Sequence, residues 1–168
     1  MLNIDPHADF RAREGRHSGN GFSYALADGY LKRYAVFGLD ESYNNQNILE
    51  QFRASADLYY LSFDELLTFS TDARDRLFKD ALRWLGPGPI GLELDLDSIT
   101  GMPASAMNDS GLTMRQVRLL IKTAASLATP FYFHLAEGSP DCAYHPGQIN
   151  ILGKAMAHLI TDFVKGCK

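Results

Sequence analysis

The sequence has 168 residues, 46% of them hydrophobic and 21% charged, which predicts a single domain over residues 1–168 with a sizeable core. Its 16 basic and 20 acidic side chains give a formal net charge of −4, which argues against a nucleic-acid partner, because no basic surplus exists to displace phosphate counterions. The 2 cysteines are too few for a disulfide framework, and the sequence does not open with a basic and then apolar export signal. No apolar run approaches the roughly 18 residues that a membrane span needs. We therefore expect a cytoplasmic protein.

Short runs rich in β-branched and aromatic residues alternate along the chain with amphipathic stretches, which is the pattern of a parallel sheet joined by crossover helices. The predicted fold class is therefore α/β. The predicted strands cover residues 2–4, 34–39, 56–61, 89–96 and 130–136, and the predicted helices cover residues 21–32, 45–53, 73–85, 113–127 and 148–165. The last helix is the clearest, because its apolar residues recur every three or four positions and form one stripe.

The first predicted strand begins close to Met1. An interior strand of a parallel sheet is normally preceded by elements that cover it, so we expect an amino-terminal part of the fold to be missing. A sheet edge left open in this way would favour a homo-oligomer or a partner polypeptide.

Three potential metal ligands, Asp5, His7 and Asp9, follow the first strand in the segment NIDPHADFR. Pro6 lacks an amide hydrogen, so the chain is expected to leave the strand ladder there and form a loop. In a straight strand Asp5 and Asp9 would be about 13 Å apart at ~3.3 Å per residue, so the segment must curl or serve two ions. The alternative is an exposed polar turn in which Asp5 caps the loop.

A second acidic cluster, Glu93, Asp95 and Asp97, lies in the run IGLELDLDSIT. The alternation places all three on one face of a strand whose other face is apolar, and like charges on an interior strand are costly unless a cation meets them. On an edge strand the same face would simply be solvated. Both clusters stand where an apolar run ends, and the ligand crevice of an open parallel sheet lies at the carboxyl ends of its strands. We therefore expect the two clusters to meet.

Together Asp5, Asp9, Asp95 and Asp97 would bring four negative charges into one crevice, and two divalent cations would balance them, with His7 as a nitrogen ligand. Because the other donors are all oxygen atoms, a hard ion such as Mn²⁺ is favoured over an ion that prefers thiolates. Two such ions can share a water molecule and lower its pKa, so the pattern indicates a hydrolase.

Four segments, NIDPHADFR, HSGNGFSYAL, LELDLDSI and FHLAEGSP, follow one another in an order that resembles the carboxyl-terminal part of the arginase (ureohydrolase) superfamily. The resemblance implies a three-layer α/β/α sandwich with a parallel sheet, and two Mn²⁺ ions that serve the hydrolysis of a guanidine or an amidine. It also implies that Asp5, His7, Asp9, Asp95 and Asp97 are the metal ligands.

Within the superfamily, Arg11 and the HSG of HSGNGF resemble formimidoylglutamase-like members, whereas arginases carry Asn at the position of Arg11 and His where Phe22 stands. This implies N-formimidoyl-glutamate as the substrate, hydrolysed to glutamate and formamide in histidine breakdown. Arg11 could hold a substrate carboxylate with its bidentate fork, or it could pair with Glu14 or with a metal-loop aspartate. Asn20, in the same stretch, is a further candidate for substrate binding.

Glu137, in HLAEGSPD, stands where the superfamily places a carboxylate that hydrogen-bonds the amidinium group, so it is a candidate for substrate binding and catalysis. Taken alone it would be a solvated loop residue. His17 could relay a proton to the leaving amine, although its neighbours are equally typical of a turn. His134 is expected to be a core histidine with its hydrogen bonds satisfied.

The superfamily also uses a metal-ligand histidine from a glycine-rich loop ahead of the first motif, and this sequence has no counterpart of it. We therefore expect this chain by itself to be weakly active or inactive, with the ion that relies on Asp9 as the weaker one. Three other interpretations stay open. They are an arginase or agmatinase-type ureohydrolase, a non-catalytic truncated paralogue, and an ordinary α/β domain whose acidic clusters are solvated.

Overall fold

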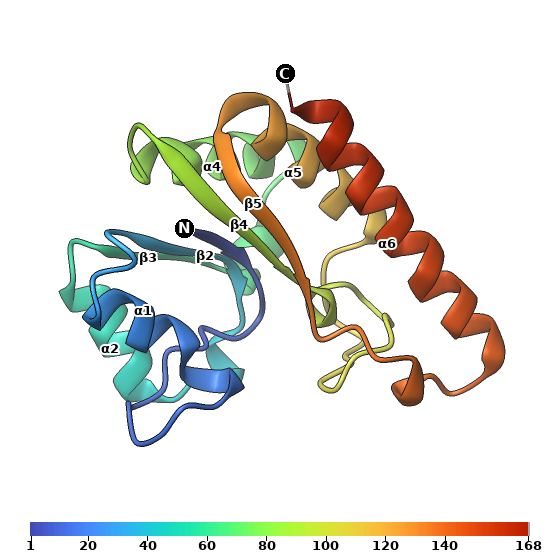
Figure 1. The fold of residues 1–168 in the computed structure, drawn as a ribbon, viewed down its shortest axis with the longest axis horizontal. Coiled ribbons are helices and arrows are strands. Elements are labelled where there is room, and N and C mark those ends of the chain that lie inside the picture. The colour runs from blue at the N-terminus through green and yellow to red at the C-terminus, as the bar shows by residue number, and fades with distance from the viewer. Residues whose placement is uncertain (168) are drawn as a thin grey trace.

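The structure, a computed structural model, describes residues 1–167. Five parallel strands form one sheet in the order β3-β2-β1-β4-β5. The strands are β1 (Leu2–Ile4), β2 (Tyr34–Leu39), β3 (Leu58–Ser62), β4 (Pro89–Asp95) and β5 (Thr129–Ala136). The amino-terminal strand β1 therefore lies in the middle of the sheet, between β2 and β4 (Figure 1).

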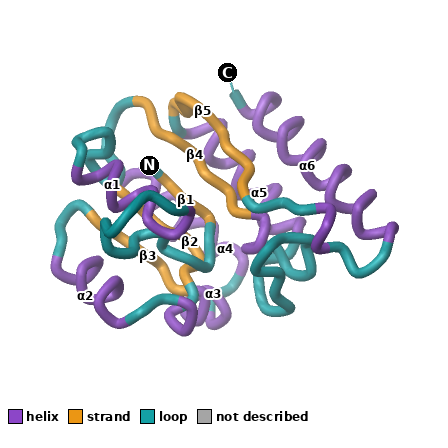
Figure 2. The backbone as a smooth tube through the Cα atoms, turned by 60° about the horizontal axis from the view of Figure 1, so that its bottom comes forward, coloured by secondary structure: helices purple, strands orange, loops and turns teal. Residues whose placement is uncertain are grey.

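Helices cover both faces of the sheet, which confirms the predicted α/β/α layers. The helices are α1 (Gly21–Ala27), α2 (Gln46–Ala54), α3 (Phe63–Thr68), α4 (Thr71–Trp84), α5 (Met114–Leu127) and α6 (Pro146–Gly166). The larger core joins one face of the sheet to α3, α4, α5 and α6, and the smaller core joins the other face of β1, β2 and β3 to α1 and α2. Figure 1 and Figure 2 show α1 and α2 near β2 and β3, and α6 alongside α5 at the other end of the sheet.

The alternation of buried side chains in β1 explains this arrangement. Leu2 and Ile4 enter the larger core, whereas Met1 enters the smaller core on the opposite face. Asn3 shares the face of Met1, because successive side chains of a strand point to opposite sides of the sheet. β1 is buried on both faces, as an interior strand of a parallel sheet must be.

One predicted helix is shorter in the structure, and one helix of the structure was not predicted. The helix predicted over residues 21–32 ends at Ala27, because Gly29 adopts a positive φ of 80°, a conformation that glycine tolerates and that ends a helix. The helix α3 was not predicted, although Ser62 and Glu65 form a capping box at its start. No helix within residues 1–167 is long and apolar enough to cross a membrane.

The register of the sheet positions the two acidic segments. Ile4 pairs with Leu94 on the neighbouring strand, so Asp5 and Asp95 are the next residues of β1 and β4 at the same edge. Because the strands are parallel, this is the carboxyl edge of both. The prediction that the two clusters meet at this edge is confirmed.

Candidate metal centre

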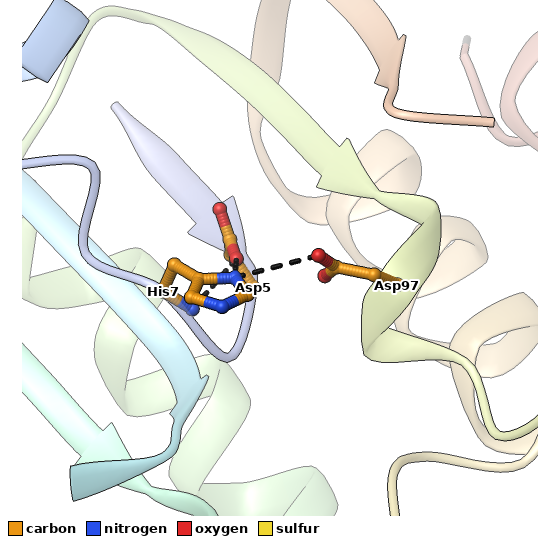
Figure 3. Close-up of side chains that lie close together, drawn as sticks. All are labelled: Asp5, His7 and Asp97. Carbon is orange, nitrogen blue, oxygen red and sulfur yellow. Dashed lines mark hydrogen bonds and ion pairs between the residues drawn. The ribbon is translucent and has the colours of Figure 1, made fainter. Parts of the chain in front are cut away.

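Three side chains converge at the carboxyl edge of the sheet: Asp5, His7 and Asp97. Each offers one potential ligand atom, and these atoms lie within 4.8 Å of one another. The Nδ1 atom of His7 lies 3.4 Å from Asp5 Oδ1 and 3.4 Å from Asp97 Oδ2. Figure 3 shows the two carboxylates reaching the His7 ring from different segments of the chain.

The same kind of turn follows both strands and aims these side chains. Asp5 Oδ1 accepts a hydrogen bond from the backbone N–H of His7 at 2.7 Å, and Asp95 Oδ1 accepts one from the N–H of Asp97 at 3.0 Å. An aspartate that bonds the amide two residues ahead turns the chain sharply. The turn brings His7 and Asp97 back toward the end of the sheet.

This turn corrects one expectation about the second acidic cluster. The strand was predicted to reach residue 96 with three carboxylates on one face, but β4 ends at Asp95 and Asp97 lies in the short 3₁₀ turn Leu96–Ser98. Glu93 remains on the strand and bonds His134 on β5, with Oε2 and Nδ1 2.5 Å apart. Of the three acids, Asp97 is therefore the one that joins Asp5 and His7.

Asp9 and Asp95 lie beside the three-residue group without belonging to it. The chain curls at Asp9, whose φ is 47°, so the extended geometry that would separate it from Asp5 is avoided. Both carboxyl groups sense the charge of Asp5, which contributes to their raised pKa values. Both carboxyl groups therefore lie within electrostatic range of Asp5.

Burial makes the acidic cluster unfavourable without a cation. It raises the pKa of Asp5, and burial together with the charges of Asp5 and Asp97 raises the pKa of Asp95 to about 9. Burial, with a smaller contribution from Asp5, raises the pKa of Asp9 to about 7. Hydrogen bonds to Asp5 and Asp97 raise the pKa of His7 to about 10. Protons therefore neutralise the cluster when no other positive charge is present.

The donor set fits a hard divalent cation. Asp97 Oδ1 is buried and has no hydrogen-bond partner among the described residues, and a buried oxygen of this kind needs a donor or a cation. Asp5, His7 and Asp97 together offer carboxylate oxygens and one imidazole nitrogen, a set that suits manganese better than an ion that prefers thiolates. These residues could therefore hold Mn²⁺.

Two residues after β2 support the metal loop, and the sequence analysis missed both. The ring of Tyr43 stacks on His7 with centroids 5.4 Å apart. Asn44 donates from Nδ2 to the carbonyl of Pro6 at 2.9 Å, and its Oδ1 accepts from the N–H of Ala8 at 2.9 Å. Their position at the carboxyl end of the neighbouring strand was the signal that could have found them.

Glu137 lies next to this site, in the loop after β5. It has a positive φ of 59°, and its Oε2 accepts a hydrogen bond from Ser105 Oγ at 2.6 Å. The negative charge of Glu137 contributes to the raised pKa of Asp9, so the two carboxylates are near one another. The side chain of Glu137 is exposed.

The segment after Asp9 carries the other candidate residues, which differ in their exposure to solvent. Arg11 and His17 are exposed, and Arg11 makes no ion pair with Glu14 or with an aspartate among residues 1–167. Asn20 is buried, and its amide donates to the carbonyls of Ala12 at 3.0 Å and Gly15 at 2.7 Å. Its side chain thus braces the loop, and the substrate contacts assigned to these residues stay predictions.

The expectation for His134 was wrong in one respect. Its Nδ1 atom is satisfied by Glu93, but its side chain is 60% exposed and does not lie in the core. The reason is that β5 is an edge strand, and the helices of the smaller core cover β1, β2 and β3 instead.

Comparison with known proteins gives a consistent result. The model of the Arginase family matches residues 1–164. A formimidoylglutamase of Macrococcus caseolyticus is 30% identical over 142 residues, which cover 84% of this chain and 44% of that protein.

Solved structures agree at the level of the fold. The formimidoylglutamase of Bacillus subtilis superposes with a TM-score of 0.85 at 17% identity, over 98% of this chain and 52% of its own. A formiminoglutamase of Trypanosoma cruzi, solved with Mn²⁺, superposes with a TM-score of 0.81 at 20% identity, over 98% of this chain and 55% of its own. The chain thus spans about half the length of the relatives it matches.

Proposed function

This chain belongs to the arginase family, and we propose that it carries the metal site of a Mn²⁺-dependent hydrolase that cleaves a C–N bond in linear amidines, with N-formimidoyl-glutamate as the substrate. The observation that carries the proposal is the convergence of Asp5, His7 and Asp97, with a buried oxygen of Asp97 that has no hydrogen-bond partner among residues 1–167. A solvated acidic surface would not bury these carboxylates, because charge is costly away from water.

Five residues would hold the metal. We assign Asp5, His7, Asp95 and Asp97 to one ion, and Asp5, Asp9 and Asp95 to a second and weaker one. The first set contains the residues that already converge, and the second has oxygen donors only. A bound manganese supplies Lewis-acid polarisation and lowers the pKa of a water molecule.

The chain's own residues orient the substrate. The carboxylate of Glu137 accepts two N–H hydrogen bonds from the planar amidinium group and holds its carbon over the metal site. Ser105 Oγ fixes this carboxylate from the side. His17 delivers a proton to the leaving amine.

Arg11 binds the glutamate end of the substrate. Its guanidinium is exposed and makes no ion pair among the described residues, so it is free to bind a carboxylate of the glutamate moiety. Agmatine has no carboxylate and gains nothing from this residue. The relative in Macrococcus caseolyticus is a formimidoylglutamase, which agrees with this choice. A place in histidine breakdown and a cytoplasmic location follow as parts of the proposal.

The test compares three substrates on the purified chain loaded with Mn²⁺. N-formimidoyl-L-glutamate, agmatine and L-arginine are supplied separately, and formamide or urea is measured as the product. Because we expect this chain by itself to be at most weakly active, even slow formamide release from the first substrate supports the proposal, provided that chelator abolishes it. If the chain releases urea from agmatine or arginine but no formamide from the first substrate, it is a different ureohydrolase. If calorimetry detects no Mn²⁺ binding, the metal site is rejected.

A further inference from the structure

A chain of buried hydrogen bonds begins at the Oδ2 atom of Asp5. Asn3 is 2% exposed, and its Nδ2 atom donates to Asp5 Oδ2 at 2.9 Å and to Tyr34 Oη at 3.0 Å. The hydroxyl of Tyr34 in turn donates to the carbonyl of Ala8 at 2.9 Å. Both amide hydrogens of Asn3 and the single hydrogen of the Tyr34 hydroxyl therefore have acceptors.

We propose that Asn3 and Tyr34 are positioning residues that hold the Asp5 carboxylate and the loop carrying His7 in the geometry that binds the metal ion. The inference rests on the proposed function, because it assigns these residues to the same metal site. Neither residue is assigned as a ligand.

The bonds fix both oxygens of Asp5. Oδ2 receives the amide of Asn3, and Oδ1 receives the backbone N–H of His7 at 2.7 Å. A carboxylate held at both oxygens cannot rotate about its terminal bond without losing one of them. Oδ2 has two lone pairs, so the bond from Asn3 leaves one of them available to a cation.

The same network holds the far end of the metal loop. Ala8 follows His7 directly, and its carbonyl accepts from Tyr34 while its N–H donates to Asn44 Oδ1 at 2.9 Å. His7 therefore lies between two restrained points, Asp5 and Ala8. Restraint of this kind keeps the ligand atoms in place when the metal is absent, which removes an ordering cost from metal binding.

The burial of the network favours a role beyond packing. Tyr34 is fully buried, and burial together with the charge of Asp5 raises its pKa, so the hydroxyl keeps the proton that it donates to Ala8. An amide and a hydroxyl buried in this way destabilise a core unless each is bonded. An apolar pair would fill the space without that requirement, but it would leave Asp5 Oδ2 without a donor.

The experiment measures Mn²⁺ affinity by isothermal titration calorimetry on three variants of the whole chain: Asn3→Leu, Tyr34→Phe and the double variant. Asn3→Leu should raise the dissociation constant for Mn²⁺ about 10- to 100-fold, which is the usual effect of removing a hydrogen-bond partner of a metal ligand. Tyr34→Phe should give a smaller loss. The double variant should lose less than the product of the two single losses, because the residues act in one chain of bonds.

Matched controls separate this role from stability. Tyr60→Phe removes a hydroxyl that bonds Glu41 on the surface, and Asn45→Ala removes the side chain that caps α2. Both should leave Mn²⁺ affinity unchanged, and Asn45→Ala should lower the melting temperature. If Asn3→Leu does not fold, Tyr34→Phe tests the proposal by itself, since it removes one oxygen atom and keeps the ring.

The outcomes distinguish the two proposals. A wild-type chain that binds no Mn²⁺ overturns the proposed function and this inference with it. A wild-type chain that binds Mn²⁺, together with variants that melt lower and bind it equally well, overturns the positioning role alone. Weaker binding by both variants at temperatures well below their melting points supports it.

Discussion

The carboxylates of Asp5 and Asp97, which follow two different strands, both reach the Nδ1 atom of His7, which lies 3.4 Å from an oxygen of each. The pairing of β1 with β4 brings the two turns together at one edge of the sheet. Because both carboxylates are buried, their negative charge is unfavourable unless a proton or a cation balances it.

Metal binding should stabilise the fold through Asp97. At a Mn²⁺ concentration of about 100 times the dissociation constant, linkage gives about 2.7 kcal/mol, which corresponds to a rise of roughly 5–11 °C in the melting temperature for a chain of this size. Asp97→Asn should remove most of this rise. Differential scanning calorimetry with and without Mn²⁺ measures it, and Asp109→Asn, an exposed acid in the following loop, is the control. An equal rise in both variants would place the metal elsewhere.

The metal-free chain should lose stability as the pH rises. The pKa of Asp9 is raised to about 7, that of Asp95 to about 9 and that of His7 to about 10, so the folded state holds protons that the unfolded state releases earlier. The contribution of Asp9 should be lost between about pH 4 and 7, that of Asp95 up to about pH 9, and that of His7 from about pH 6.5 to 10.

Thermal melts in chelator across pH 5 to 9.5 measure this dependence. Mn²⁺ should stabilise the chain more at pH 9 than at pH 5, because fewer protons must leave when the metal binds. A melting temperature that stays constant across this range would contradict the raised pKa values, because the folded and unfolded chains would then bind the same number of protons.

Arg11 should control the choice between substrates. Arg11→Met removes a charged hydrogen-bonding partner of a carboxylate, so kcat/KM for N-formimidoyl-glutamate should fall about 10- to 100-fold, mostly through KM. Turnover of agmatine, if any, should not change. Arg13→Met is the matched control, because Arg13 is an exposed arginine on the same segment. Equal losses in the two variants would remove the specific role of Arg11.

Glu137 should affect the reaction but not metal binding. Glu137→Gln keeps the shape of the side chain and removes its charge, so kcat/KM should fall by about 100-fold through the lost amidinium contact. Ser105→Ala should give a smaller loss, since Ser105 bonds the carboxylate of Glu137 and is assigned no substrate contact of its own. Mn²⁺ affinity by calorimetry should be unchanged in both, whereas a lost metal ion in Glu137→Gln would make Glu137 a ligand. Asp141→Asn, in the turn beyond, is the control.

The sequence predicted the local features of the fold well because their causes are local. The strand at 34–39 matches β2, and the apolar stripe of residues 148–165 lies within α6. The sequence predicted the end of the helix after Asn20 too far along the chain, because the positive φ of Gly29 depends on how the chain turns into β2. The α3 helix was missed despite its capping box, because its six residues are too short to show a periodicity.

By itself, the sequence determined which residues are candidates for the site, since carboxylates and a histidine at the ends of apolar runs are visible without a structure. Only the tertiary structure decided which of them meet. The strand order sets β4 beside β1, β4 ends one residue earlier than expected, and Asp97 turns toward His7 while Glu93 turns to His134. The bonds from Asn3 to Asp5 and Tyr34 were invisible for the same reason, because pairing between strands distant in sequence depends on the packing of the whole sheet and leaves no local pattern.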